Sequence, residues 1–349
     1  MLLTNKALKS QFLSTCERLN DGQLTLRTPE GERYNFGTTG PEAEMVIRDW
    51  SAVSALAAHG QVGLGEAYVQ GLWDSPSVEG LMVIAMRNRD HLGQYDAANA
   101  FNKAKFRLVD NLLRANTRRG SRKNIRSHYD VGNEFYQLWL DEGMSYSSGL
   151  FTPSDQDLGT AQQRKNARAL SRLNDDGSIL EIGCGWGGFA EYASSLGRDV
   201  TGITISRNQH SYAECRLDGR ADIQLCDYRD VGGKFDNIVS IEMIEAVGER
   251  YWPSYFSTLK NALADDGRVL LQAITVNDEF FDTYKQSSDF IRQYVFPGGM
   301  LLSNQVIGEQ AKRAGLKVQD NLAFGQDYAK TCRIWSQRLT KQKHKISQL

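Results

Sequence analysis

Residues 178–188, with the sequence SILEIGCGWGG, decide the fold class. A short β-rich run, Ser178–Ile182, leads into glycines at 183, 185 and 187, and a helical stretch follows. Alternate glycines permit a tight turn and let a ligand approach the backbone closely. Further β-rich runs alternate with helical stretches at residues 200–205, 223–225, 235–241 and 269–274. This alternation predicts an α/β fold with a doubly wound, mostly parallel sheet.

Glu181, inside the first strand, indicates which cofactor the glycine loop binds. A dinucleotide loop has the spacing G-x-G-x-x-G, which is met here only if Gly188 serves in place of Gly187. A carboxylate two residues before the loop is instead typical of S-adenosylmethionine (SAM) sites, where it orients the methionine amino group. We therefore expect SAM, with a nucleotide as the alternative.

The segments after the second and third strands would complete this site. Many nucleotide sites have an acidic residue after the second strand that binds the ribose hydroxyls. Residues 202–209 contain no acid, so we expect Thr204 and Gln209 to supply these hydrogen bonds. The third strand leads to Asp227 and Tyr228, an acid and an aromatic ring placed to meet an adenine. Asp227 could equally be a helix N-cap.

The composition excludes several classes of protein. The 349 residues include 41 Lys and Arg against 42 Asp and Glu, a net charge of −1, and 41% apolar residues, which is ordinary for a globular protein and not for a disordered or coiled-coil one. The overall charge gives no reason to expect a nucleic-acid partner. Five scattered cysteines without metal-ligand spacing predict no metal site and favour a reducing cytoplasm. The longest apolar run, Leu81 to Met86, is too short to span a membrane.

The chain divides into two predicted domains. Residues 1–120 read as a small α+β domain, with strands near residues 24–28 and 33–36 followed by helices, and residues 121–349 form the cofactor domain. Residues 101–128 carry nine Lys and Arg against one acid, and residues 329–349, which read as a helix with a basic tail, carry six and none. Apolar residues interleave with the first block, as in an interfacial helix, although a solvated linker helix is the plainer alternative. If both segments share a face, they could hold the chain, its N-terminal domain included, at an anionic membrane.

Eight ordered segments between about residue 60 and residue 335 together resemble the cyclopropane-fatty-acyl-phospholipid synthase family, including its mycolic-acid relatives. They are residues 127–136, 144–147, 181–188, 202–209, 227–230, 244–248, 294–299 and 324–328. The resemblance implies a Rossmann-like class I methyltransferase fold with a lid over residues 275–300. The cofactor-binding residues expected from the motifs and the resemblance are Tyr129, Ser147, Glu181, Gly183, Gly185, Gly187, Thr204, Ile205, Gln209, Asp227, Tyr228 and Arg229.

The resemblance also implies the reaction. A methyl group would pass from SAM to the cis double bond of an unsaturated acyl chain of a membrane phospholipid, and loss of a proton from the resulting cation would close a cyclopropane. Aromatic rings could stabilise the cation. The candidates are Tyr129, Tyr146, Tyr294, Phe296 and Tyr328, for each of which core packing is the alternative.

The family holds a bicarbonate ion that is thought to take the proton. Glu245 and Tyr328 match its glutamate and tyrosine, and the backbone of Ile274 is retained. Ser148 stands where the family commonly has cysteine, and Gln272 where it has histidine. Both can still donate hydrogen bonds to an anion. The loss of imidazoles leaves a methylene or methyl-branched chain as alternative products.

Two other functions remain open. One is a small-molecule N- or C-methyltransferase of the same fold, and the other is a cofactor-binding protein without catalysis. The lipid enzyme is the leading hypothesis, bacterial and cytoplasmic, and peripherally bound to the inner face of the membrane. The chain stops at Leu349, where the family pattern continues to a last strand. An open sheet edge would invite pairing with a second copy, which makes a homodimer a candidate assembly.

Overall fold

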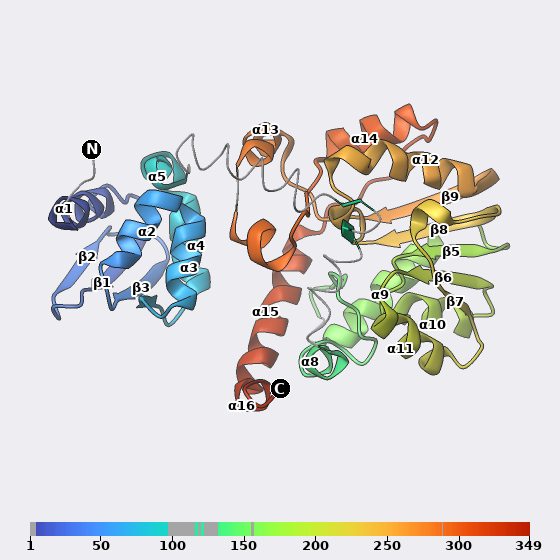
Figure 1. Cartoon of the computed structure of the whole chain (residues 1–349), viewed down its shortest axis with the longest axis horizontal. Helices are drawn as coiled ribbons and strands as arrows, with labels where there is room; N and C mark the ends of the chain where they lie inside the picture. The colour runs from blue at the N-terminus through green and yellow to red at the C-terminus, as the bar shows by residue number, and fades with distance from the viewer. Residues whose placement is uncertain (1–4, 97–115, 118–119, 122–131, 155–156, 288) are drawn as a thin grey trace. The chain divides into compact units, whose positions relative to one another are not determined.

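A computed structural model describes residues 5–96, 116–117, 120–121, 132–154, 157–287 and 289–349 (Figure 1). The chain forms two compact units. The first consists of Met1–Leu113 with Asp282–Pro297, and the second of Arg114–Phe281 with Gly298–Leu349.

The first unit contains a four-stranded sheet in the order β2-β1-β3-β4. Alternation sets its core, because Leu24 and Leu26 of β1 are buried while Thr25 between them is only half-buried. Helices α1, α2 and α4 contribute further apolar side chains to the same cluster. The elements are α1 (Asn5–Cys16), β1 (Gln23–Arg27), β2 (Arg33–Phe36), β3 (Glu42–Ile47), α2 (Ser51–His59), α3 (Gln61–Val69), β4 (Trp73–Asp74), α4 (Val78–Arg87) and α5 (Arg89–Asp96).

Residues 282–297, most of the predicted lid, group with this first unit. They hold the end of α13 (Asp278–Gln286) and a π-helical turn, Ile291–Val295. Phe290 lies so close to Gly65 that a Cβ there would come within 2.3 Å of its ring. The Tyr294 hydroxyl donates a hydrogen bond to Glu66. The division therefore differs from the predicted boundary near residue 120, because these contacts join segments more than 220 residues apart.

The second unit is built on a five-stranded sheet in the order β7-β6-β5-β8-β9, with every neighbouring pair parallel. In Figure 1, α9, α10 and α11 lie on one side of this sheet and α12 and α14 on the other. The elements are α8 (Asn133–Gln137), α9 (Leu158–Ser171), β5 (Ile179–Ile182), α10 (Gly188–Ser195), β6 (Val200–Thr204), α11 (Arg207–Leu217), β7 (Asp222–Leu225), β8 (Phe235–Ile241), α12 (Trp252–Ala262), β9 (Leu263–Gln272), α14 (Asn304–Arg313), α15 (Gly325–Lys341) and α16 (Lys343–Ile346).

Strand β5 is central and buried along its whole length, as expected for a parallel strand covered on both faces. The chain continues from β5 to β6 on one side, and β8 pairs with β5 on the other. The crevice outside the carboxyl ends of β5 and β8 is thus the topological switch point, where ligands bind in such sheets. This topology confirms the predicted doubly wound, Rossmann-like fold.

The two basic segments have different outcomes. All nine basic residues of 101–128 lie outside the described residues, so that expectation stays a prediction. The predicted helix near the C-terminus is present as α15, which ends at Lys341, and the basic tail after it contains the short helix α16 (Lys343–Ile346). Within the described part of the chain, no helix is both long and apolar enough to cross a bilayer.

Candidate active site

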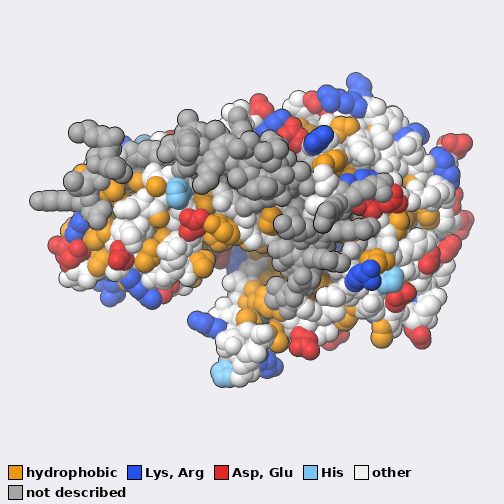
Figure 2. All heavy atoms as spheres, in the orientation of Figure 1, with side chains coloured by type: hydrophobic (Ala, Val, Ile, Leu, Met, Phe, Trp, Pro, Cys, Tyr) orange, Lys and Arg blue, Asp and Glu red, His pale blue; other side chains and the backbone are white. Residues whose placement is uncertain are grey.

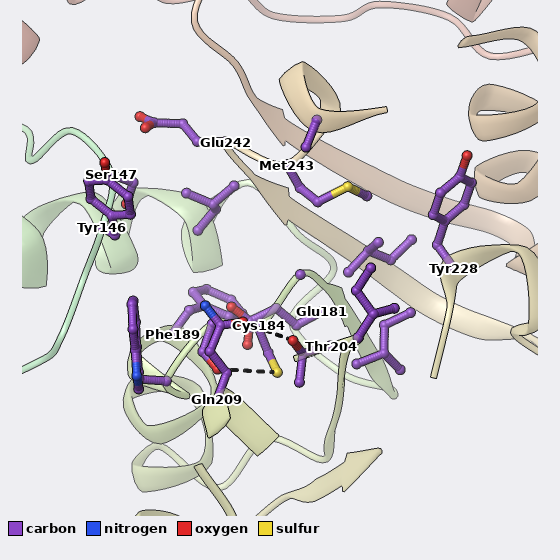
Figure 3. A pocket seen from close by; sticks show the side chains of 18 of the residues that line it. Tyr146, Ser147, Glu181, Cys184, Phe189, Thr204, Gln209, Tyr228, Glu242 and Met243 are labelled. Atoms are coloured by element: carbon purple, nitrogen blue, oxygen red, sulfur yellow. Dashed lines mark hydrogen bonds between the residues drawn. The ribbon is translucent and has the colours of Figure 1, made fainter. Parts of the chain in front are cut away.

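A pocket opens at the switch point of the large sheet, lined by residues that follow β5, β6, β7 and β8 (Figure 3). The segment before α9 closes one side with Tyr146 and Ser147. Figure 3 shows Tyr146, Ser147 and Glu242 toward one end of the pocket and Tyr228 toward the other. The pocket is therefore elongated along the sheet edge, with Glu181 between its ends.

Glu181 provides the strongest sign of a cofactor. Its side chain is buried, and among the described residues its Oε2 has no hydrogen-bond partner. Burial raises the pKa of Glu181 to about 8, against the opposing effect of the Lys165 charge. A buried carboxylate oxygen without a partner is costly. An ammonium group would relieve this cost, as the methionine amino group of SAM would do.

The glycine loop leaves space for that cofactor. Gly183, Gly185 and Gly187 all have positive φ, which favours glycine. A Cβ on Gly185 would meet no atom within 4 Å and would project into open space in the pocket lining. A Cβ on Gly183 would come within 2.8 Å of Met243. Gly187 does not line the pocket and instead begins α10 as its N-cap.

Thr204 and Gln209 lie in the pocket lining, as predicted, and are joined to each other. The Thr204 hydroxyl donates to Gln209 Oε1 at 2.9 Å, and both side chains are buried. Ser206 caps α11 between them by accepting from the Gln209 backbone. This bond fixes the Gln209 side-chain amide in the pocket lining, where its nitrogen could donate to a ribose hydroxyl.

Asp227 takes the capping role that the sequence left open. It caps the turn Tyr228–Asp230, and both of its oxygens accept hydrogen bonds from the Arg229 guanidinium, at 2.8 and 2.6 Å. The Arg229 guanidinium also stacks over the Tyr228 ring, at 5.2 Å from its centroid. All three residues line the pocket. Tyr228 is thus held as a flat wall, suited to an adenine ring, at the end opposite Tyr146.

Lys165 is a pocket residue that the sequence analysis missed. Its ammonium is buried and donates to Ser147 Oγ at 3.0 Å. Burial lowers its pKa, while the charges of Glu242, Asp141 and Glu181 raise it. It thus offsets part of the negative charge that these carboxylates bring into the site. Its position on the buried face of α9 gave no signal, because a lysine among alternating polar residues reads as solvated.

The five predicted catalytic residues lie together, although none of them lines the pocket. The backbone of Ile274 donates a hydrogen bond to Glu245 Oε1. Ser148 N donates to Glu242 Oε1 at 2.9 Å, and so does Gln272 Nε2. The pKa of Tyr328 is raised by burial and by the nearby charge of Glu242.

Glu242 was also missed by the sequence analysis, and it joins this group to the pocket. It lines the pocket and follows the last residue of β8. Burial raises the pKa of both Glu242 and Glu245, the latter to about 8, and the charge of Glu242 adds to the effect on Glu245. Glu242 accepts hydrogen bonds from two N–H groups, and the positive charge of Lys165 favours its ionised form. Of the two carboxyl groups, Glu242 is therefore the one that holds the negative charge.

The arrangement does not fit a bound bicarbonate. The Ser148 N–H is committed to Glu242, and the Ser148 hydroxyl donates to Gly149 O at 2.9 Å. The Gln272 amide is committed to Glu242 and, at 3.4 Å, to Ser148 O. A further anion would also be repelled by the carboxylate of Glu242. Of the groups that the resemblance assigns to bicarbonate, Ser148, Gln272 and the Ile274 N–H are thus already bonded within the protein itself.

An aromatic cluster adjoins the Tyr146 end of the pocket. Tyr146 lies 5.3 Å from Trp139, 5.6 Å from Tyr136 and 5.4 Å from Trp335, measured between ring centroids. Tyr328 packs edge-on to Trp335. Of the predicted aromatic candidates, Tyr146 and Tyr328 therefore belong to this cluster. Tyr294 and Phe296 lie in the first unit, and Tyr129 is outside the described residues, which also leaves its predicted role in cofactor binding a prediction.

Comparisons with known proteins agree with this site. A family model described as mycolic acid cyclopropane synthetase matches residues 116–349. The chain is 32% identical to the tuberculostearic acid methyltransferase of Mycobacterium tuberculosis, over 93% of this chain and 80% of that one. It is 31% identical to the cyclopropane-fatty-acyl-phospholipid synthase of Escherichia coli, over 85% of this chain and 76% of that one.

Among solved structures, a mycolic acid cyclopropane synthase complexed with SAH and CTAB superposes with a TM-score of 0.60 and 29% identity. The match covers 64% of this chain and 85% of that one. The family match, the fold and the buried Glu181 agree on one cofactor, SAM. The chain belongs to the mycolic acid cyclopropane synthetase family of SAM-dependent methyltransferases.

Proposed function

We propose that the protein transfers a methyl group from SAM to the cis double bond of an unsaturated fatty acyl chain of a membrane phospholipid, and that proton loss then closes a cyclopropane. The observation that carries this proposal is the Tyr146 end of the pocket. There, an aromatic cluster adjoins a buried pair of carboxylates, Glu242 and Glu245.

Each part of this end suits one step of the reaction. The sulfonium of SAM is electrophilic, and the double bond supplies the electron pair, so no nucleophilic side chain is needed. Methyl transfer leaves a carbocation on the acyl chain, which water would quench. Aromatic faces stabilise a cation, and a buried site excludes water. A carboxylate at the same place can accept the proton.

The names of the relatives support a fatty acyl substrate, and they leave two products in view. The synthase of Escherichia coli supports a cyclopropane. The tuberculostearic acid methyltransferase supports the second candidate, a methylene or methyl-branched chain. Gln272 stands where the family has one histidine, and Ala246 where it commonly has another, so the groups around the deprotonation step differ and the second candidate stays open.

The C-terminal helices support a membrane-bound substrate. Lys341, Lys343 and Lys345 are exposed at the junction of α15 and α16, and basic side chains are visible at that end of the second unit in Figure 2. Arg338, in contrast, turns inward and donates to the Leu140 carbonyl at 2.7 Å. Each basic residue near an anionic surface contributes about 1 kcal/mol to binding. We therefore propose that this end binds the anionic inner face of the cytoplasmic membrane.

The test is methyl transfer from labelled SAM to phosphatidylglycerol vesicles. Vesicles with cis-unsaturated chains should incorporate label, whereas matched vesicles with saturated chains should not. Charge reversal at Lys341, Lys343 and Lys345 should weaken vesicle binding and leave SAM binding unchanged. Label in a small amine offered in the same reaction would favour the small-molecule alternative. SAM binding without any transfer would contradict the enzymatic proposal.

A further inference from the structure

Glu242 has an unusual backbone at the edge of the pocket. It follows β8 with a φ of 48°, in the left-handed region that non-glycine residues rarely adopt. Its N–H donates to the Gln272 carbonyl at 2.8 Å, which holds the backbone in this state. Such conformations cost free energy and persist where the surroundings enforce them, often at functional sites. The strain at Glu242 therefore suggests that its side chain is needed at this position.

The carboxylate of Glu242 is held by hydrogen bonds from two sides. Ser148 N and Gln272 Nε2 both donate to its Oε1 at 2.9 Å. Gln272 thus binds Glu242 twice, once through its backbone carbonyl and once through its side chain. Fixing one oxygen in this way orients the carboxylate and leaves Oε2 to face other groups. These two residues position Glu242.

The charged and titratable groups around Glu242 come from several elements. Lys165 of α9 brings a positive charge, while Glu245, after β8, is the second carboxyl group. Tyr328 and Cys332 of α15 also feel the charge of Glu242. With one lysine and one neutral carboxyl beside it, Glu242 can remain ionised in the resting site.

Its location matches the transfer end of the bound cofactor. In Figure 3, Glu242 lies toward the Tyr146 end of the pocket, away from Tyr228. Glu181 pairs in register with Val239 of β8, three residues before Glu242. At about 3.3 Å per residue, Glu242 is up to about 10 Å beyond Glu181 along the strand direction. With the amino group of SAM on Glu181 and its adenine near Tyr228, the acyl chain would approach from the side of Glu242.

We propose that the Glu242 carboxylate is the base of the reaction, standing where the family uses bicarbonate. This inference rests on the proposed function. The π electrons of the acyl chain form a C–C bond to the methyl carbon as the S–C bond breaks and SAH leaves. The transferred methyl then loses a proton to Glu242, and the electron pair of that C–H bond closes the ring. The protonated Glu242 returns its proton to solvent before the next turnover.

The experiment compares three proteins, wild type, Glu242→Gln and Glu242→Gly, in buffer freed of carbon dioxide and in buffer with added bicarbonate. Wild-type transfer should be the same in both buffers. Glu242→Gln should lose transfer by about 10²- to 10⁴-fold, the contribution of a general base, and bicarbonate should not restore it. Glu242→Gly suits the positive φ and vacates the space of the carboxylate, so bicarbonate should restore its transfer at least tenfold.

Controls separate catalysis from folding. Both variants should bind SAM within about threefold of wild type and unfold cooperatively. Glu191→Gln, a carboxylate outside the pocket lining, should behave as wild type. Bicarbonate-dependent transfer by the wild type, or full activity of Glu242→Gln, would overturn this proposal alone. Absence of transfer to lipid by the wild type would overturn the proposed function and this proposal with it.

Discussion

Replacing Glu181 by Gln removes the charge that we expect to hold the amino group of SAM. A hydrogen bond to a charged partner contributes about 1.5–3 kcal/mol. Because burial raises the pKa of Glu181 to about 8, the free protein at pH 7 must first give up a proton, at a cost of about 1.4 kcal/mol. The Gln variant should therefore lose little SAM-binding free energy near pH 6 and about 1–2.5 kcal/mol at pH 8.

The SAM dissociation constant of Glu181→Gln, divided by that of the wild type, should therefore change with pH. The ratio of Glu181→Gln to wild type should rise by up to tenfold per pH unit between pH 6 and pH 8. Taking a ratio largely cancels the titration of the cofactor's own amino group. Isothermal titration calorimetry in buffers of different ionisation enthalpy should also count about 0.9 more protons released by wild type than by the variant at pH 7.

Glu191→Gln is the matched control for this measurement. Glu191 of α10 pairs with Arg216 of α11 and with Arg220, and it does not line the pocket. Its variant should bind SAM with the wild-type pH dependence. A Glu181→Gln protein that binds SAM as tightly as wild type at pH 8, or a ratio that is constant with pH, would refute the assignment of Glu181 to the amino group.

Three further predictions concern the pocket and its supports. Burial raises the pKa of Glu245 to about 8, so the folded protein binds a proton that the unfolded chain releases, and the free energy of unfolding should fall as pH rises from about 5 to 8. Glu245→Gln should reduce this dependence by up to about 1.4 kcal/mol per pH unit, measured by urea unfolding at several pH values. Equal pH dependence in the two proteins would contradict the account. Gly185→Ala should cost about 1 kcal/mol of stability and weaken SAM binding strongly, whereas Gly219→Ala, also at positive φ in open space, should cost the same and leave binding intact. Tyr255→Phe removes a buried hydrogen bond of 2.8 Å to Ser240 and should lower the unfolding free energy by about 1 kcal/mol without changing SAM affinity; no loss of stability would argue against that bond.

The sheet and the cofactor side of the site could be predicted because their signals are local. The five β-rich runs coincide with β5 to β9 within a few residues, with β9 beginning earlier than expected, at Leu263. Glu181 is next to the last residue of β5, Thr204 ends β6 and Gln209 is in the helix that follows, and parallel strands bring their carboxyl ends to one edge. Order along the chain was therefore enough to place these residues in one pocket.

The remaining features depend on contacts that leave no local pattern. Glu242 looks like an ordinary acid after a strand, and only the folded chain brings Ser148 and Gln272 to its carboxylate. Lys165 is buried by residues from other elements. The grouping of 282–297 with the first unit depends on Phe290 meeting Gly65, which is small enough to admit its ring. Such pairings join residues 30 to 225 positions apart and are set by packing, so they cannot be derived from alternation or spacing.

The central claim, that SAM methylates an unsaturated acyl chain which then loses a proton, is tested most directly with cofactor carrying three deuterium atoms on its methyl group. The protein is incubated with this cofactor and oleoyl phosphatidylglycerol vesicles, and the acyl chains are analysed by mass spectrometry. The account predicts chains that have gained one carbon and retain two of the three deuterium atoms, because the third leaves with the proton acceptor. Acyl chains that remain unlabelled while the protein binds the cofactor would contradict it.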